Sequence, residues 1–128
     1  MSREEQRGAG PVVKSADAVA SKEVAAGTAT QSQVLLGPDD GAPNFFLRRF
    51  RMEAGGGMPL HTNTVEHEQF VLRGRAEVRL GEARHVVEAG SVLLIPAGLP
   101  HSYRVLEAPF EFLCVVPNGS DRIEVLED

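Results

Sequence analysis

Three features are missing from this 128-residue sequence, and each absence excludes a class of protein. Cys114 is the single cysteine, so the chain has no internal disulfide. No apolar stretch approaches the ~18 residues that a membrane-spanning helix needs, so a membrane is not an expected partner. Lys and Arg number 13 against 18 Asp and Glu and form no basic face, so nucleic acid is not an expected partner either.

The two ends of the chain and its length bound the domain organisation. The first residues, from Met1 to Arg7, are polar, and no apolar core of a signal peptide follows them, so we expect a cytoplasmic protein. Residues 1–11 lack periodicity and predict a flexible tail. Residues 12–128 contain no internal repeat and no long linker, which predicts one domain with an N-terminal arm.

Thirteen Gly and eight Pro favour short strands and tight turns over helices. Alternating apolar residues predict strands over 28–36, 44–52, 66–72, 75–80, 84–88, 92–95, 110–116 and 123–126, with a further short one at 12–14. Turns are expected at 55–57 and 73–74, and the Ala-rich segment 15–26 predicts at most a brief helix. The unbroken apolar run at 92–95 predicts a strand covered on both sides. The pattern indicates an all-β fold, a closed or nearly closed jelly-roll barrel whose mouth forms a small-molecule pocket.

Five polar residues stand at positions that a curled sheet would bring together. The two-residue period of a strand puts His61 and Asn63 on one face, and His67 and Gln69 on one face of the next strand. His101 follows a Pro-x-Gly turn and joins them only if the sheet curls round on itself. Three imidazoles and an amide oxygen would suit a borderline divalent metal with room for water or substrate. The alternative is that the histidines are hydrogen-bonded core residues without a metal.

Two motifs in this region resemble those of the cupin family. Gly55 to Gly74 is similar to Gly-x5-His-x-His-x3-Glu-x6-Gly, and Gly90 to His101 is similar to Gly-x5-Pro-x-Gly-x2-His. Asn63 stands where the second His is usual, His67 where the Glu is usual, and Val105 where an Asn often ends the second motif. A Glu-His-Glu variant that supplies a ligating His at the Glu position is common in small single-domain cupins.

The resemblance extends loosely from Val12 to Pro117 and implies a double-stranded β-helix of RmlC-like type. It implies a divalent transition metal, Mn, Fe, Ni, Zn or Cu, with the ligand set His61, Asn63, His67 and His101. Ligating imidazoles give their other ring N–H to an acceptor, for which Glu66, Glu68 and Gln69 are the candidates.

Four further side chains are candidates for the substrate pocket. Arg48 alternates with large apolar residues, so its guanidinium either reaches out to solvent or an interface, or anchors a substrate carboxylate. Cys114 is either a small buried hydrophobe or part of the pocket. Gln69 and Tyr103 face inward and either orient a substrate or complete hydrogen bonds of the core.

Three functions are compatible with these residues. The first is a metal-dependent enzyme acting on a small organic molecule, an oxidoreductase of the oxygenase kind, an isomerase or a lyase. The second is a non-catalytic module that binds a metal or a small ligand, and the third is a structural dimer that has lost its chemistry. We also expect a homodimer, as in related small cupins, in which residues 12–24 of each chain cover the partner's barrel.

Overall fold

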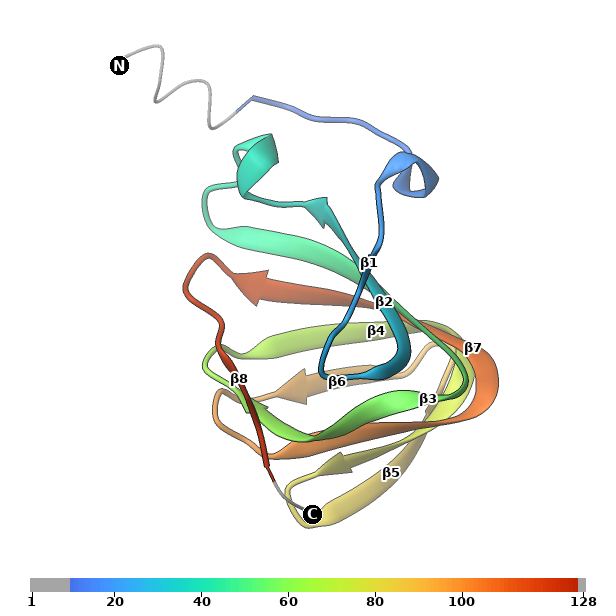
Figure 1. Cartoon of the computed structure of the whole chain (residues 1–128). Coiled ribbons are helices and arrows are strands. Elements are labelled where there is room, and N and C mark those ends of the chain that lie inside the picture. Colours follow the sequence, from blue (N-terminus) through green and yellow to red (C-terminus); the bar gives the residue numbers. More distant parts are fainter. Residues whose placement is uncertain (1–9, 127–128) are drawn as a thin grey trace.

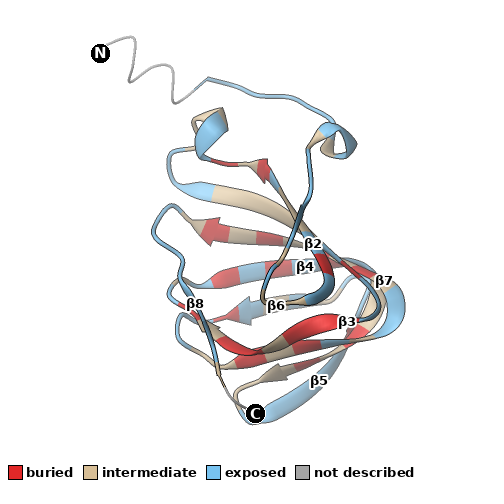
Figure 2. Cartoon of the chain, in the orientation of Figure 1, coloured by how far each residue is buried: buried red, intermediate tan, exposed pale blue. Residues whose placement is uncertain are grey.

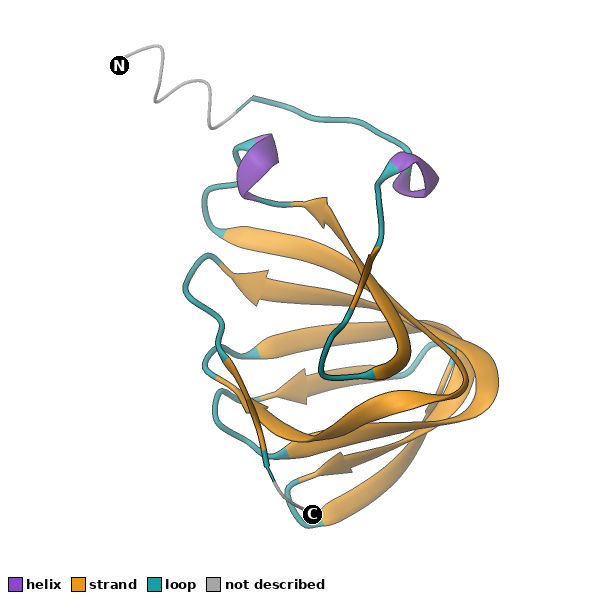
Figure 3. Cartoon of the chain, in the orientation of Figure 1, coloured by secondary structure: helices purple, strands orange, loops and turns teal. Residues whose placement is uncertain are grey.

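The computed structural model describes residues 10–126, and these form one eight-stranded antiparallel sheet that folds over on itself (Figures 1 and 3). The strands are β1 Lys22–Glu23, β2 Thr28–Leu36, β3 Phe45–Asn63, β4 His67–Leu80, β5 Ala83–Glu88, β6 Val92–Ile95, β7 His101–Pro117 and β8 Ile123–Val125. Two single-turn 3-10 helices, η1 Ala16–Ala18 and η2 Pro38–Asp40, complete the structure. No helix within residues 10–126 is long and apolar enough to cross a bilayer.

The three long strands β3, β4 and β7 each contribute to both layers of the barrel and curve round the same side of the molecule (Figure 1). In the first layer, residues 45–52 of β3 pair with 110–117 of β7, which also pair with the start of β4. In the second layer, residues 57–61 of β3 pair with 101–104 of β7, which pair with the end of β4. Strands β1, β2 and β6 extend the first layer, and β5 and β8 extend the second.

Glycine makes the crossings between the layers possible. Gly57 has φ +155 and Gly74 has φ +81, values that other residues rarely adopt. A Cβ atom at Gly57 would overlap the carbonyl of Tyr103, and one at Gly74 would overlap the carbonyl of Pro109. The register of β3 with β7, and that of β4 with β7, shifts around these residues, as expected where β-bulges bend long strands.

The core lies between the layers and is built from the inward positions of the long strands (Figure 2). Its fully buried members include Met52, Val71, Ala76, Val78, Ile95, Phe110, Phe112 and Cys114. Because strand residues alternate between faces, the same strands present charged residues outward. Ion pairs such as those of Arg75 with Glu88 and Glu107 cover the outer face of the second layer.

The all-β jelly-roll fold and most of its strands confirm the sequence prediction. Strand β2 has the predicted bounds, and the predicted inward row of β7 from Phe110 to Val116 is buried. The inward row of β4 from Ala76 to Leu80 is likewise buried or half-buried. These agreements arise because a strand with one buried face must alternate with a period of two.

Several local predictions were wrong. Segments 44–52 and 55–57 belong to one strand, β3, and the segments expected at 66–72 and 75–80 are both part of β4, because glycine bends these strands without ending them. Segment 12–14 is not a strand, and 15–26 contains η1 and β1 instead of an α-helix. Strand β6 is covered on one side only, since Val92 and Leu94 are exposed.

The N-terminal arm lies along the first layer of its own chain. Gln33 donates hydrogen bonds to the carbonyls of Ala16 and Val19, and Lys14 forms an ion pair of 2.7 Å with Asp40. The predicted tail, residues 1–11, falls mostly outside the described residues.

The close approach at Gly74 generates a stability prediction. Gly74→Ala should lower the free energy of unfolding by at least about 2 kcal/mol more than Gly90→Ala, because both residues have positive φ but only Gly74 faces a neighbouring backbone. Denaturant unfolding of both variants measures the difference. Equal losses would show that β4 accommodates a side chain at its bend.

Candidate metal centre

The four predicted metal-site residues are brought together at one end of the space between the layers. His61 and Asn63 end β3, His67 begins β4, and His101 begins β7 opposite His61. All four are buried. The ring centroids of His61 and His101 lie 4.1 Å apart, and those of His67 and His101 lie 6.2 Å apart. The curled sheet that the sequence analysis required is therefore present.

Backbone carbonyls fix two of the three rings. His61 Nδ1 lies 2.7 Å from the Pro59 carbonyl oxygen, and His101 Nδ1 lies 2.8 Å from the Leu99 carbonyl oxygen. A carbonyl only accepts, so each Nδ1 donates its proton and each neutral ring keeps an unprotonated Nε2. The acceptors suggested by sequence were wrong: Glu66 and Glu68 are exposed, and Gln69 bonds elsewhere.

Burial keeps these two rings neutral. It lowers the pKa of both His61 and His101, and the nearby imidazoles lower it further. For His101 the pKa falls to about 4. Two neutral imidazoles with free Nε2 atoms are the form in which histidine binds a metal.

Sequence analysis missed Asp121, which lies between β7 and β8 and reaches the histidine cluster. Its Oδ2 is 3.4 Å from His67 Nε2, and its Oδ1 accepts a hydrogen bond of 3.3 Å from Asn63 Nδ2. Burial lowers the pKa of His67, but the Asp121 carboxylate and the Cys114 sulfur outweigh it and raise the value to about 9. No motif marks Asp121, because its position depends on the pairing of β8 with β3.

The segment that carries Asp121 is held by a neighbouring turn. Thr64 Oγ1 donates to the carbonyl of Ser120 and accepts from the amide of Arg122, at 2.7 and 2.8 Å. The Thr64 amide in turn donates to the Arg122 carbonyl. This turn joins β3 to β4, so it also connects the strands that supply Asn63 and His67.

Three buried polar atoms of the cluster lack a well-formed hydrogen bond: Asn63 Oδ1, His67 Nε2 and His101 Nε2. Buried polar atoms in proteins are normally satisfied, so the unpartnered acceptors Asn63 Oδ1 and His101 Nε2, which line the same cavity, indicate a site for a ligand. His67 Nε2 instead faces Asp121 Oδ2 at 3.4 Å as a protonated donor. As the side chains stand, no three His, Cys, Asp or Glu residues within 10–126 are grouped to hold a metal ion.

A cavity of about 330 Å³ opens beside the cluster. One part of its wall is apolar or aromatic and includes Phe50, Met52, Met58, Tyr103, Phe112 and Ile123, while the histidine cluster, Arg48 and Asp121 form the polar part. Phe50 and Tyr103 each stack on Phe112, with ring centroids 5.1 and 5.4 Å apart. Such a cavity has the size and character of a site for a small flat organic molecule.

The four predicted pocket residues form a connected polar row beneath this cavity. Tyr103 donates to Gln69 Oε1 at 3.0 Å, and Gln69 Nε2 lies 3.7 Å from Cys114 Sγ. Arg48 Nη2 lies 3.4 Å from the same sulfur. Burial raises the pKa of Cys114, but His67 and the charge of Arg48 outweigh it and lower the value. Burial raises the pKa of Tyr103, which therefore remains a neutral donor.

A barrel of this topology with a histidine cluster at its mouth defines the class of cupin-type domains. The model of the cupin domain family matches residues 48–116, slightly more than half of the chain. The chain therefore belongs to the cupin family. Among curated proteins, it is 42% identical to quercetin 2,3-dioxygenase of Bacillus subtilis over 52 residues, which are 40% of this chain and 15% of that enzyme.

Solved structures extend the likeness to nearly the whole chain. The polyketide cyclase RemF from Streptomyces resistomycificus has a TM-score of 0.81 at 26% identity, covering 92% of this chain and 88% of RemF. A cupin 2 domain-containing protein from Halorhodospira halophila has a TM-score of 0.71 at 30% identity, covering 77% and 70% of the two chains. Both are cupin barrels of similar length to this one.

The depressed pKa of His101 predicts that this residue opposes folding of the metal-free protein in acid. An unfolded His binds a proton with a pKa near 6.5, but folded His101 resists protonation down to about pH 4, so its contribution to stability falls by about 2 kcal/mol as the pH falls from 8 to 5. His67, whose pKa in the folded protein is about 9, gains about 2 kcal/mol over the same range and offsets this loss in the wild type. Denaturant unfolding in chelator at both pH values should therefore show that His101→Gln gains about 2 kcal/mol relative to the wild type between pH 8 and pH 5. Equal pH dependence in both proteins would contradict a neutral folded His101.

Proposed function

We propose that this chain is a metal-dependent cupin that binds a small, flat organic molecule in its cavity and acts on it. The observation that carries the proposal is that Asn63 Oδ1 and His101 Nε2, two buried acceptors without a partner, line the same cavity as His67. His61, whose ring is fixed next to that of His101, supplies the third imidazole. Three imidazoles suit Mn, Fe, Ni, Zn or Cu.

The chain's own residues would hold and orient the metal and its ligand. Pro59 and Leu99 keep the Nε2 atoms of His61 and His101 available. Asp121 accepts from the Asn63 amide nitrogen, which turns the amide oxygen toward the cluster. His67 has to turn from Asp121 and release its Nε2 proton in order to ligate. The metal, when bound, polarises an oxygen atom of the molecule in the cavity.

The cavity selects for flat apolar molecules because aromatic rings line it. The stacked rings of Phe50, Phe112 and Tyr103 offer faces and edges for a further ring to pack against. A quercetin 2,3-dioxygenase and a polyketide cyclase are among the similar proteins. We therefore favour an oxygenase, isomerase or lyase type of reaction on such a molecule.

A non-catalytic binding module is the second candidate function. It is favoured by the contact of Asp121 with His67 and Asn63, which leaves the side chains without a ready group of three ligands. Such a module would take up the metal or the organic molecule and release it unchanged. Turnover by the metal-loaded protein separates the two candidates.

Metal content tests the ligand assignment. His101→Ala should weaken metal binding by more than about 100-fold, because even the loss of a group behind a ligand costs about 10- to 100-fold. Elemental analysis of the purified protein and a competition titration measure the change. His85→Ala, at an exposed His on β5, is the matched control and should bind like the wild type.

Equal metal content in the His101 variant and the wild type would overturn the assignment. With the metal established, O₂ consumption and product analysis on phenolic, thiol and keto-acid compounds test for catalysis. A protein that binds metal and a compound from this panel but leaves every compound unchanged would be a binding module.

We further propose a homodimer, in which the outer face of β6 and the adjoining part of β4 form the interface. Phe70, Val92 and Leu94 are exposed there, with 46%, 73% and 59% of their surfaces accessible, and Phe70 pairs with Val92. An apolar patch of this kind favours association, and a two-fold dimer is the commonest closed assembly. The N-terminal arm, expected to cover a partner, already lies on its own chain.

Light scattering on the variant Val92→Glu with Leu94→Glu tests this interface. The wild type should be a dimer at micromolar concentration, and the double variant should be a monomer with an unchanged circular dichroism spectrum. A double variant that remains dimeric, together with dissociation on deletion of residues 1–24, would show that the N-terminal arm forms the interface instead.

A further inference from the structure

Arg48 is a cation in the cavity wall without a carboxylate partner among the described residues. It lies on β3 and points inward with Phe50 and Met52, and all three line the cavity. Within residues 10–126 its one polar contact is the 3.4 Å approach of Nη2 to Cys114 Sγ. Its Nε is buried and has no hydrogen-bond partner.

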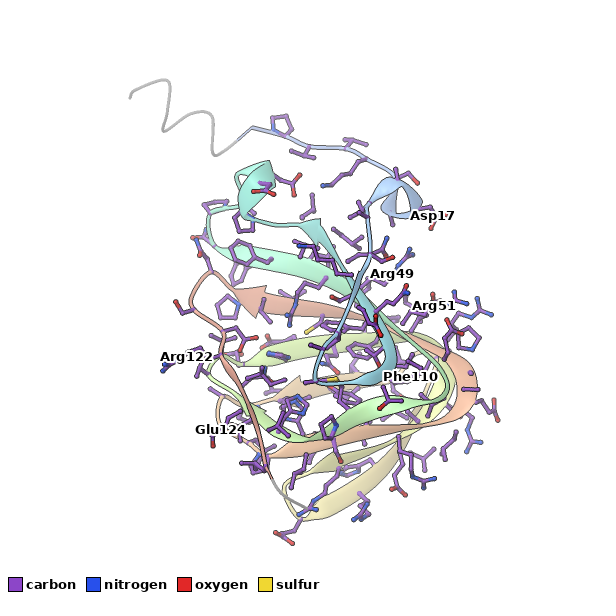
Figure 4. All side chains as sticks on the ribbon, in the orientation of Figure 1. Asp17, Arg49, Arg51, Phe110, Arg122 and Glu124 are labelled. Carbon is purple, nitrogen blue, oxygen red and sulfur yellow. The ribbon has the colours of Figure 1, made fainter. Side chains whose placement is uncertain are left out.

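The neighbouring arginines of the same strand show how unusual this is. Arg49 pairs with Asp17 at 3.2 Å, and Arg51 pairs with Glu53 at 2.6 Å and with Glu111 at 3.2 Å. These two point to the opposite face of β3 and lie on the outside of the molecule, as Figure 4 shows for Arg49 and Asp17. Alternation along the strand therefore places the paired guanidiniums in solvent and the unpaired one in the cavity.

The surroundings of Arg48 hold it in place for a ligand. Its guanidinium carbon lies 5.1 Å from the centroid of the Phe50 ring, a cation–π arrangement that fixes the plane of the group. The nearby carboxylate of Asp121 is already in contact with Asn63 and His67. Lys22 and Glu23 also line the cavity, but Arg48 is the cation that packs on its aromatic wall. Its buried Nε has no acceptor among the described residues, and a buried donor is costly unless a ligand pairs with it.

We propose that Arg48 binds the carboxylate of a flat aromatic acid whose ring occupies the cavity against Phe50 and Phe112. This inference rests on the proposed function, since it names the class of molecule that the cavity takes. A guanidinium presents a planar fork of N–H donors that matches the two oxygens of a carboxylate, and the unpartnered Nε is part of that fork. The stacked aromatic rings provide the apolar surface for the rest of the molecule.

Binding of 2-naphthoate and of its neutral amide, 2-naphthamide, tests the proposal. The two probes share shape and ring system and differ in charge. The chain contains no Trp, so naphthalene fluorescence reports binding with little background from the protein. The acid should bind about 10- to 100-fold more tightly than the amide, as expected for a charge-assisted hydrogen-bonded pair. Both probes are measured on chelator-treated and on metal-loaded protein.

Substitutions then assign the preference to one residue. Arg48→Gln should remove the preference for the acid while keeping the affinity for the amide, and Arg48→Lys should keep part of the preference. Arg49→Gln, on the outer face of the same strand, is the matched control and should behave as the wild type. Thermal melting confirms that each variant is folded.

Equal affinities for acid and amide in the wild type, or an unchanged preference in Arg48→Gln, would overturn the proposal. A preference that exists only in the metal-loaded protein would also overturn it, because the metal would then hold the carboxylate. Metal content measured on the same samples is independent of the probes. A wild type that binds metal but shows no acid preference therefore rejects the Arg48 site alone, while a wild type that takes up no added metal but prefers the acid rejects the metal centre alone.

Discussion

Each of the strands β3, β4 and β7 crosses from one layer of the barrel to the other, and the crossings of β3 and β4 pass residues that leave no space for a side chain. At Gly57 and Gly74 the neighbouring carbonyl groups of Tyr103 and Pro109 occupy the place of a Cβ atom. Because of these crossings, the end of β3 and the start of β7 meet in one layer while the start of β4 faces them from the other. The histidine cluster exists only because the bends bring these three strand ends together.

The orientation and charge of each ring in the histidine cluster depend on the protein groups that the ring contacts. Carbonyl groups two residues earlier in the chain hold the rings of His61 and His101, and burial keeps both neutral. His67 differs, because the carboxylate of Asp121 lies beside its Nε2 and stabilises the protonated form. Three histidines of one cluster therefore have two different electrostatic environments, and the difference comes from the Asp121 carboxylate together with the Cys114 sulfur.

The cavity is formed by a barrel that relatives share and by individual side chains of this sequence. The barrel and its open end are shared with relatives that carry out different reactions, so the fold does not specify a substrate. Arg48 packed on Phe50 and Asn63 bonded to Asp121 line the cavity, and the buried thiol of Cys114 lies behind them in contact with Arg48.

Much of the fold could be predicted from local pattern. Alternation identified β2 and the inward rows of β4 and β7, and the two motifs identified the cluster of His61, His67 and His101. Predictions failed where glycine is used for a bend inside a strand, as at Gly74, since a turn and a bulge require the same backbone conformation. The exposed outer face of β6 was also missed, because an apolar run does not show which of its faces is covered.

The sequence by itself determined the class of fold and the members of the histidine cluster, because the period of a strand and the spacing of two motifs are properties of neighbouring residues. Tertiary structure decided the rest. Asp121 contacts His67 only because β8 pairs with β3. Asn63 and Asp121, which are bonded to each other in this region, are 58 residues apart along the chain. Arg48 faces the cavity without an ion pair among the described residues, while Arg49 and Arg51 pair with Asp17 and Glu111 on the outer face of β3. Contacts between distant segments have no signature in a single sequence, and the chemistry of this cavity depends on such contacts.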